Sequence, residues 1–267
     1  MSSPGDRHRS EALRDAVGEA RGSVDGSGEA RRTALSPPPA EATVVFGDGD
    51  GVTAAARYAE ILATDGIDHG LIGPREVPRL WARHLLNCAV IGERIPDGAS
   101  VIDIGSGAGL PGIPLAIARP DLRLTLIEPL LRRSEFLERV VSELGLSSVR
   151  VVRGRAEERA VRAEVPAADI VTSRAVAPLE RLAAWSAPLI APDGRLVAIK
   201  GSSAADEICR DAAAVERLGI TDLHTELCGE GRIPDPTTVV IGRKTTTPGS
   251  AASRRSARRG SRGKAGS

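Results

Sequence analysis

Long apolar runs are missing from this sequence of 267 residues. No stretch approaches the roughly 18–20 consecutive apolar residues that a membrane-spanning helix needs. The N-terminus also lacks the apolar core of a secretory signal peptide. We therefore expect a soluble, cytoplasmic protein without a membrane partner.

Cysteine is scarce as well. The chain has three cysteines, Cys88, Cys209 and Cys228, which is an odd number at wide spacings. Such a set fits neither a disulfide framework nor a cluster of metal ligands. We expect three reduced thiols in the core of a cytosolic protein, and no metal site.

Aromatic residues make up only 2% of the chain. They do not interleave with basic residues in the way of modules that stack RNA bases on exposed rings. Trp81 and Trp185 are therefore expected in the core.

Basic residues concentrate at the C-terminal end. Eight of the 36 Lys and Arg residues lie from Arg243 onward, where Asp and Glu are absent, which leaves 28 basic against 35 acidic residues elsewhere. The body of the chain is thus acidic and the tail basic. Any nonspecific attraction to nucleic acid falls largely on the tail.

Both ends of the chain have the composition of disordered segments. Residues 1–45 are rich in Gly, Ser, Ala, Arg and Pro, and residues 244–267 are similar. Neither has the apolar periodicity that buries a core face. We expect one folded domain over residues 46–243, in a protein that is a monomer.

The folded region has two parts with different patterns. Residues 46–97 predict a helical cap, with Ala59 and Leu62 on one apolar stripe and a second helix after Gly73-Pro74. From Ser100 onward, strands and helices alternate.

The alternating region predicts the elements of a sheet covered by helices. Strands are expected at 101–104, 122–128, 149–152, 169–173, 196–199, 223–228 and 238–242, and helices at 112–118, 130–144, 178–189 and 206–218. A turn is expected at Pro192-Asp-Gly194, and the last two strands should form a hairpin. This order predicts an α/β fold with a mostly parallel seven-stranded sheet and helices on both faces.

The first strand-to-helix turn is rich in glycine. It reads Asp103-Ile-Gly-Ser-Gly-Ala-Gly-Leu-Pro-Gly112. Glycines at 105, 107 and 109 allow positive φ angles and let a ligand approach the backbone. In a doubly wound sheet such a turn lies where ligands bind.

Two kinds of cofactor compete for this loop, a dinucleotide and S-adenosylmethionine. The strand ends at Ile104, which starts the loop two residues too early for the dinucleotide register. Asp103 would repel a pyrophosphate but suits a sulfonium cofactor. Pro111 and Pro114 remove amide donors that a pyrophosphate would use. We therefore predict S-adenosylmethionine, with Asp103, Gly105 and Gly107 in its binding site.

Acidic residues follow the next two strands. Glu128 ends the second strand, where a carboxylate can accept both ribose hydroxyls, although it can also be only a solvated strand end. The pair Ala156-Glu157 follows the third strand, where its backbone amides can pair with an adenine edge. Glu157 can equally be a first-turn helix acid.

Several motifs together resemble one family. They are Arg83-His-Leu-Leu, the stretch from Asp103 to Ile117, Arg155-Ala-Glu-Glu, Thr172-Ser-Arg-Ala and Ala198-Ile-Lys-Gly. Over residues 58–243 the chain is similar to the small-subunit ribosomal RNA methyltransferase G family, also called glucose-inhibited division protein B. The resemblance implies a class I methyltransferase (Rossmann-like) fold and transfer of a methyl group from S-adenosylmethionine to N7 of a guanine in 16S rRNA of the small ribosomal subunit.

The resemblance also implies individual contacts. It places the cofactor at Gly105, Leu110, Ala156, Glu157 and Arg174. One segment departs from the pattern: family members often carry Asn-Leu-Thr between the first two helices, where this chain has Gly70-Leu-Ile-Gly-Pro-Arg-Glu76.

Guanine N7 keeps an in-plane lone pair, so its methylation needs no general base. Catalysis is then mostly positioning, which contributes up to about 7–11 kcal/mol in favourable cases. The sequence agrees, since it lacks a Pro-Cys nucleophile and an Asn-Pro-Pro-aromatic motif after the fourth strand.

Two basic residues are the predicted catalytic residues. Arg174, after the fourth strand, can bond guanine O6 or a phosphate, or instead form an ion pair with Glu128 or Asp103. Lys200 can meet a backbone phosphate or be a solvated strand end. For His84, a satisfied core histidine is favoured over a substrate contact.

Three rival functions stay open at this point. One is a methyltransferase of the same fold that acts on a small molecule or a protein. Another is an RNA-binding assembly factor without activity. A nicotinamide-dependent oxidoreductase is the third, and it lacks a recognisable Tyr-Lys or His-Asp pair.

The basic tail generates a first prediction. Deleting the residues after Lys244 should weaken RNA binding mostly at low salt, because phosphate contacts by Lys and Arg release counterions. Cofactor binding should persist. Binding titrations over a range of salt concentrations test this, and a flat salt slope in both the full chain and the truncated chain would contradict it.

Overall fold

The computed structural model describes residues 35–245. The predicted tails lie outside these residues, apart from residues 35–45 and 244–245. Within the described range there are seven strands: β1 (Ser100–Ile104), β2 (Arg123–Glu128), β3 (Val149–Arg153), β4 (Ala168–Arg174), β5 (Ile190–Ile199), β6 (Ile220–Cys228) and β7 (Thr237–Lys244).

Helices precede the sheet and alternate with its strands. The first group is α1 (Ala40–Phe46), α2 (Asp50–Ala63), α3 (Asp65–Asp68), η2 (Pro74–Arg79), η3 (Leu80–Leu86), α4 (Asn87–Ala89) and η4 (Val90–Arg94). The second is α5 (Gly112–Ala118), α6 (Leu131–Glu143), α7 (Arg159–Glu164), α8 (Leu179–Ser186) and α9 (Ala204–Arg217). None of the helices in residues 35–245 has the length and apolar character to cross a bilayer.

The strands form one sheet in the order β3-β2-β1-β4-β5-β7-β6. Strands β1 to β5 are parallel, while β7 runs antiparallel to both β5 and β6. The expected hairpin is therefore present. The strand order reverses between β1 and β4, which is where a doubly wound sheet opens its ligand crevice.

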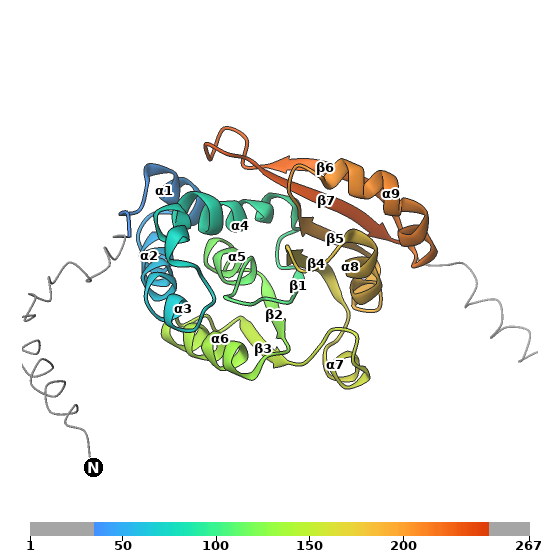
Figure 1. Ribbon diagram of the computed structural model, residues 1–267, viewed down its shortest axis with the longest axis horizontal. Helices are drawn as coiled ribbons and strands as arrows, with labels where there is room; N and C mark the ends of the chain where they lie inside the picture. The colour runs from blue at the N-terminus through green and yellow to red at the C-terminus, as the bar shows by residue number, and fades with distance from the viewer. Residues whose placement is uncertain (1–34, 246–267) are drawn as a thin grey trace, which may run out of the picture. The chain divides into compact units, whose positions relative to one another are not determined.

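Two apolar cores lie on opposite faces of this sheet. Neighbouring residues of a strand alternate between them, as the two-residue period requires: Val101 joins the first core and Ile102 the second, and Ile170 and Val171 divide likewise. Helices α1 to α6 cover the first core, and α7 to α9 cover the second (Figure 1). The glycine loop after β1 thus emerges between two covered faces.

The predicted start of the folded domain at Phe46 is too late. Helix α1 begins at Ala40, and it forms because Ala42, Val45 and Phe46 share one buried face. Ser36 is placed as well, since the indole N–H of Trp81 donates to its carbonyl at 2.9 Å. The apolar pattern of this helix is only seven residues long and follows three prolines, so the sequence did not predict a helix there.

Three further expectations need correction. The predicted second helix is a series of short helical turns, η2 to η4, in which Pro78 has no backbone N–H to donate. The expected turn at 192–194 is an irregularity inside β5 rather than its beginning. Cys88 and Cys228 are buried, but Cys209 is exposed, because Ala204, Asp211 and Val215 form the inner face of α9.

The two tryptophans pack as expected. Trp81 is buried in the first core, and Trp185 is partly buried against the second. The expected helices at 112–118, 130–144, 178–189 and 206–218 correspond to α5, α6, α8 and α9, whereas α7 was not expected.

Candidate functional site

The glycine loop is held against the neighbouring strand by its own backbone. Gly105, Gly107 and Gly109 have φ angles of +70°, +57° and +100°, in the region that favours glycine. The amides of Gly105 and Ser106 both donate to the carbonyl of Ile127 on β2, at 2.8 and 3.2 Å. The loop is therefore tied to the strand that ends in Glu128.

Glu128 lies where the sequence predicts a ribose-binding carboxylate. Its side chain is buried, with the residue 2% exposed. One oxygen accepts the Gly107 amide at 2.9 Å, and the other accepts the Leu130 amide at 3.0 Å. These bonds fix the carboxylate at the glycine loop and leave lone pairs on both oxygens, because a carboxylate has about four acceptor sites.

Asp103 is fully buried beneath the loop. Its Oδ2 accepts the Gly112 amide at 3.1 Å, while its Oδ1 has no hydrogen-bond partner among the described residues. Burial raises the pKa of this carboxyl to about 7, although the nearby Ser106 hydroxyl and the Gly112 amide oppose the rise. A buried acceptor without a partner is costly, which makes a positively charged or donating ligand favourable here.

Tyr58 also contacts the glycine loop, and no sequence pattern had marked it as a site residue. Its hydroxyl donates to the carbonyl of Ala108 at 2.7 Å, so helix α2 holds the middle of the glycine loop. A Cβ on Gly109 would lie 2.9 Å from this hydroxyl. The available signal was that Tyr58 is the only tyrosine of the chain and begins the region of family resemblance.

Arg174 forms neither of the ion pairs considered for it. Its Nη2 donates to Nδ1 of His84 at 2.9 Å, and its Nη1 donates to Sγ of Cys88 at 3.3 Å. Nε2 of His84 in turn lies 2.8 Å from Oε2 of Glu76. The guanidinium is thus turned toward the helices of the first core. His84 is the satisfied, buried histidine that the sequence favours.

Lys200 is not a solvated strand end. Its ammonium donates to the carbonyl of Ala177 and to Oε2 of Glu207, each at 2.8 Å, and its side chain is only 7% exposed. The same Glu207 oxygen accepts the Leu179 amide at the start of α8. Lys200 therefore holds the segment after β4, and its contact with a phosphate stays a prediction.

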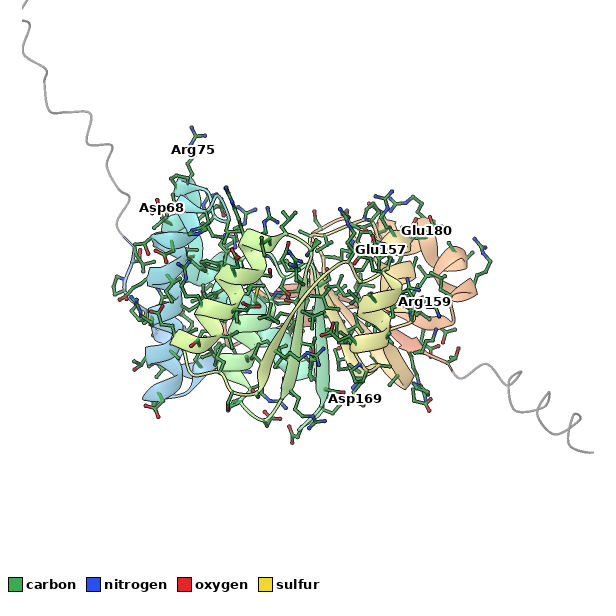
Figure 2. The ribbon with its side chains drawn as sticks, turned by 90° about the horizontal axis from the view of Figure 1, so that it is seen from below. Asp68, Arg75, Glu157, Arg159, Asp169 and Glu180 are labelled. Atoms are coloured by element: carbon green, nitrogen blue, oxygen red, sulfur yellow. The ribbon has the colours of Figure 1, made fainter. Side chains whose placement is uncertain are left out.

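The remaining predicted residues lie around the same edge of the sheet. Leu110 is half-buried beside the glycine loop, and its amide donates to the carbonyl of Ser106 at 3.0 Å. Ala156 is buried and Glu157 exposed after β3. In Figure 2, Glu157 lies at the end of the molecule opposite Asp169, which is near the beginning of β4. The end of the molecule that holds Glu157 is the one where the parallel strands terminate.

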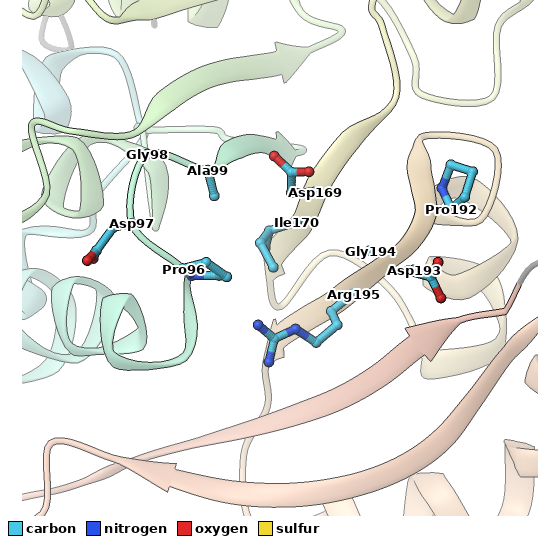
Figure 3. Close-up of a pocket in the computed structure, with 10 residues that line it drawn as sticks. All are labelled: Pro96, Asp97, Gly98, Ala99, Asp169, Ile170, Pro192, Asp193, Gly194 and Arg195. Atoms are coloured by element: carbon cyan, nitrogen blue, oxygen red, sulfur yellow. The ribbon is translucent and has the colours of Figure 1, made fainter.

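A hollow at the other end of the sheet is separate from this site. It has a volume of about 410 Å³, and Figure 3 shows Pro96, Asp169, Asp193 and Arg195 among the residues around it. These residues come from the loop before β1, the beginning of β4 and the irregular part of β5. Asp169 there accepts the amide and the hydroxyl of Ser100, at 2.8 and 2.6 Å. Its role is to join the two strands.

Over residues 35–245, no group of three or more His, Cys, Asp or Glu side chains is arranged to hold a metal ion.

Residues 52–234 match the family described as rRNA small subunit methyltransferase G. The chain belongs to this family. It is 63% identical over 201 residues to the ribosomal RNA small subunit methyltransferase G of Rhodococcus jostii (strain RHA1), covering 75% of this chain and 87% of the relative. It is 56% identical over 214 residues to the protein of that name from Mycolicibacterium gilvum (strain PYR-GCK), covering 80% and 93%.

Solved structures of methyltransferases are more distant. A predicted O-methyltransferase from Agrobacterium tumefaciens has 18% identity and a TM-score of 0.48, covering 60% of this chain and 81% of that chain. A methyltransferase from Pyrococcus furiosus has 17% identity and a TM-score of 0.46, covering 71% and 98%. These likenesses carry no argument about function. Family membership makes the chain a methyltransferase and removes the nicotinamide-dependent rival. The seven-stranded, mostly parallel sheet with helices on both faces confirms the predicted fold.

The close packing of α5 on β1 and β2 generates a stability prediction. A Cβ on Gly112 would lie 2.3 Å from Cδ2 of the buried Leu126 and 2.9 Å from Oδ2 of Asp103. Gly112→Ala should therefore lower the free energy of unfolding by about 1–3 kcal/mol. Gly73→Ala is the matched control, since its Cβ meets nothing within 4 Å. Urea denaturation compares the two, and equal stability of both variants would contradict the prediction.

The raised pKa of Asp103 generates a third prediction, on stability against pH. Between about pH 4 and pH 7 the folded chain keeps a proton on Asp103 that the unfolded chain, with a pKa near 3.8, has released. Asp103 therefore makes the free energy of unfolding fall as pH rises through this window. Asp103→Asn removes that loss, so the variant should gain stability relative to the wild type from pH 4 to pH 7 and level off above. A pH-independent difference in denaturation free energy would refute this.

Proposed function

We propose that this chain transfers the methyl group of S-adenosylmethionine to N7 of a guanine in 16S rRNA. The observation that carries the proposal is the meeting of two features at the switch point of the sheet. One is the glycine loop with Glu128 and Asp103, and the other is Arg174 at the end of the adjacent strand. The segment that follows Arg174 lies against the loop, since Cγ2 of Val176 would be 2.9 Å from a Cβ built on Gly105.

The residues present fit a nucleoside cofactor that carries positive charge. Gly107 offers room, since the nearest heavy atom to a Cβ there would be the Gly105 carbonyl oxygen at 3.9 Å. Glu128 has free lone pairs for ribose hydroxyls, and Oδ1 of Asp103 is buried without a partner. In this proposal Gly105, Leu110 and the amides of Ala156 and Glu157 complete the site, with Arg174 on the side of the transferred group.

When bound, S-adenosylmethionine supplies a methyl group on a positively charged sulfur that a nucleophile can attack. Asp103 stabilises that positive charge more strongly when it is ionised. Glu128 orients the ribose. Because guanine N7 already has a lone pair, the chain need only hold N7 in line with the methyl group and exclude water.

Arg174 is the residue proposed to hold the guanine. A guanidinium has five N–H donors, of which His84 and Cys88 accept two. The other N–H groups can donate to guanine O6 and leave the N7 lone pair free. His84 does not act as a base in this scheme, since burial and the charge of Arg174 lower its pKa and both ring nitrogens are already engaged.

The rRNA target is supported by family membership and by the relatives that carry the name ribosomal RNA small subunit methyltransferase G. The alternative is a methyltransferase of the same fold acting on a small molecule or a protein. Tritiated S-adenosylmethionine, incubated with the enzyme and with either small ribosomal subunits or free 16S rRNA, separates the two. Label in RNA that can be cleaved by aniline after borohydride reduction indicates N7-methylguanine. Label only in protein or small metabolites would reject the proposal.

Cofactor binding gives an independent prediction. Glu128→Gln should weaken the binding of S-adenosylhomocysteine by roughly 1.5–3 kcal/mol, because hydrogen bonds to a charged group contribute about that much. Glu157→Gln is the control, since its proposed contact uses the backbone amide and its side chain is exposed. Isothermal titration calorimetry measures both variants. Unchanged affinity in Glu128→Gln would exclude its proposed contact with the ribose.

A further inference from the structure

Arg174 lies at the end of a chain of polar contacts that runs away from the glycine loop. Its Nη2 lies 2.9 Å from Nδ1 of His84, and Nε2 of His84 lies 2.8 Å from Oε2 of Glu76. His84 is 8% exposed, and the side chain of Glu76 is 29% exposed. The contacts join the end of β4 to η2 and η3, elements about 90 residues earlier in the chain.

The chemistry of the partners fixes the direction of every proton in these contacts. Arg174 can only donate, so Nδ1 of His84 must accept and carry no proton. The proton of the neutral imidazole then lies on Nε2 and is donated to the carboxylate of Glu76. Arg83 and Arg79 flank Glu76, with nitrogen–oxygen distances of 3.7 and 3.9 Å, and favour its charged form.

We propose that Glu76 and His84 are positioning residues, which orient the guanidinium of Arg174 toward the substrate guanine through this fixed histidine tautomer. The inference rests on the proposed function, because it gives Arg174 its substrate. It also assigns a role to the segment Gly70–Glu76, where the chain departs from the family pattern. Glu76, the last residue of that segment, is the acidic end of the contact series Glu76–His84–Arg174, which we call the relay.

A part-buried polar chain of this kind costs desolvation that apolar packing would avoid, and its gain is a defined orientation. Arg174 has four rotatable side-chain bonds, and within residues 35–245 it forms no ion pair with a carboxylate. The neutral His84 holds it without neutralising its charge. The full positive charge of Arg174 thus stays available to O6 of the guanine.

The relay has a defined response to pH. The charged groups that face His84 are Arg174 from β4, Glu76 from η2 and the adjacent Arg83. The thiol of Cys88 also contacts Arg174. Burial and Arg174 lower the pKa of His84, whereas Glu76 raises it. Protonation would place an Nδ1–H against the Nη2–H of Arg174 and break the contact. Activity should therefore fall on the acid side as His84 gains its proton.

The first experiment observes the histidine directly and needs no activity. The chain has four histidines, so ¹⁵N-histidine labelling gives few signals, and His84→Asn assigns the one of interest. We expect the Nε2–H tautomer, a lower pKa for His84 in Glu76→Gln, and a higher one in Arg174→Gln. A His84 signal with the Nδ1–H tautomer, or a pKa that is the same in all three proteins, would overturn the relay.

The second experiment separates positioning from stability. Glu76→Ala should lower kcat for RNA methylation by about 10-fold to 100-fold, the size of effect expected from a misplaced reacting group, with KM for S-adenosylmethionine unchanged. Glu76→Gln keeps an acceptor for Nε2–H, so it should restore most of kcat at neutral pH while the acid limb of the pH profile moves to lower pH. A variant that was merely unstable would lose activity over a wider acid range instead.

Glu226→Ala is the matched control. Glu226 also accepts a contact from one histidine, Nε2 of His224 at 2.9 Å, and its side chain is 32% exposed, close to the 29% of Glu76. It lies on β6 and should leave kcat unchanged. Equal losses in Glu76→Ala and Glu226→Ala, or an acid limb that does not move in Glu76→Gln, would reject the inference. If the wild type methylates no RNA, the proposed function fails, and the histidine titration still tests the relay.

Discussion

The close approach of α5 to β1 at Gly112 is the constraint on which the site depends. With no side chain at this position, the Gly112 amide reaches Oδ2 of the buried Asp103 at 3.1 Å. That bond holds one carboxylate oxygen and leaves the other beneath the glycine loop without a partner. Any side chain at 112 would press on Leu126 in the first core, so the geometry of the loop and the packing of the core are set together.

Beyond Gly112, the glycine loop is held by contacts from the sheet and from the helices that precede it. On the sheet side, Glu128 binds the Gly107 amide and the Ile127 carbonyl accepts two loop amides. On the helical side, Tyr58 of α2 binds the Ala108 carbonyl. The helices before the sheet are thus part of the site rather than a cover added to it. Their polar side chains reach the loop and the end of β4 at positions that a bare sheet would leave to solvent.

Local patterns in the sequence were enough to predict most of the fold. The strands alternate apolar residues or form short apolar runs, the glycines mark the loop, and Glu128 stands at a strand end, so these features could be placed without any contact information. What could not be predicted involves partners that are distant in sequence. Tyr58 and Ala108 are 50 residues apart, and Arg174 and His84 are 90 apart. For Arg174 the ion pairs considered were with Glu128 or Asp103, and the contact with His84 was not predicted. The bond of Lys200 to Glu207 was also not predicted, although these two residues are only 7 apart. The exposed Cys209 was missed for a different reason, since its position one residue after the half-buried Ile208 turns it away from the inner face of α9.

The segment after β4 shows how these distant contacts combine. Ala175 has a positive φ of 52°, a strained conformation for a residue with a Cβ, so the surrounding structure must hold it there. Lys200 holds the Ala177 carbonyl from β5, and Val176 packs against Gly105 from the glycine loop. His84 and Cys88 hold the Arg174 guanidinium from the helices. Because these restraints come from the sheet, the loop and the helices, a shift in any one of them changes the direction of Arg174 relative to the glycine loop. The backbone strain at Ala175 is therefore a cost of the contacts that fix this direction.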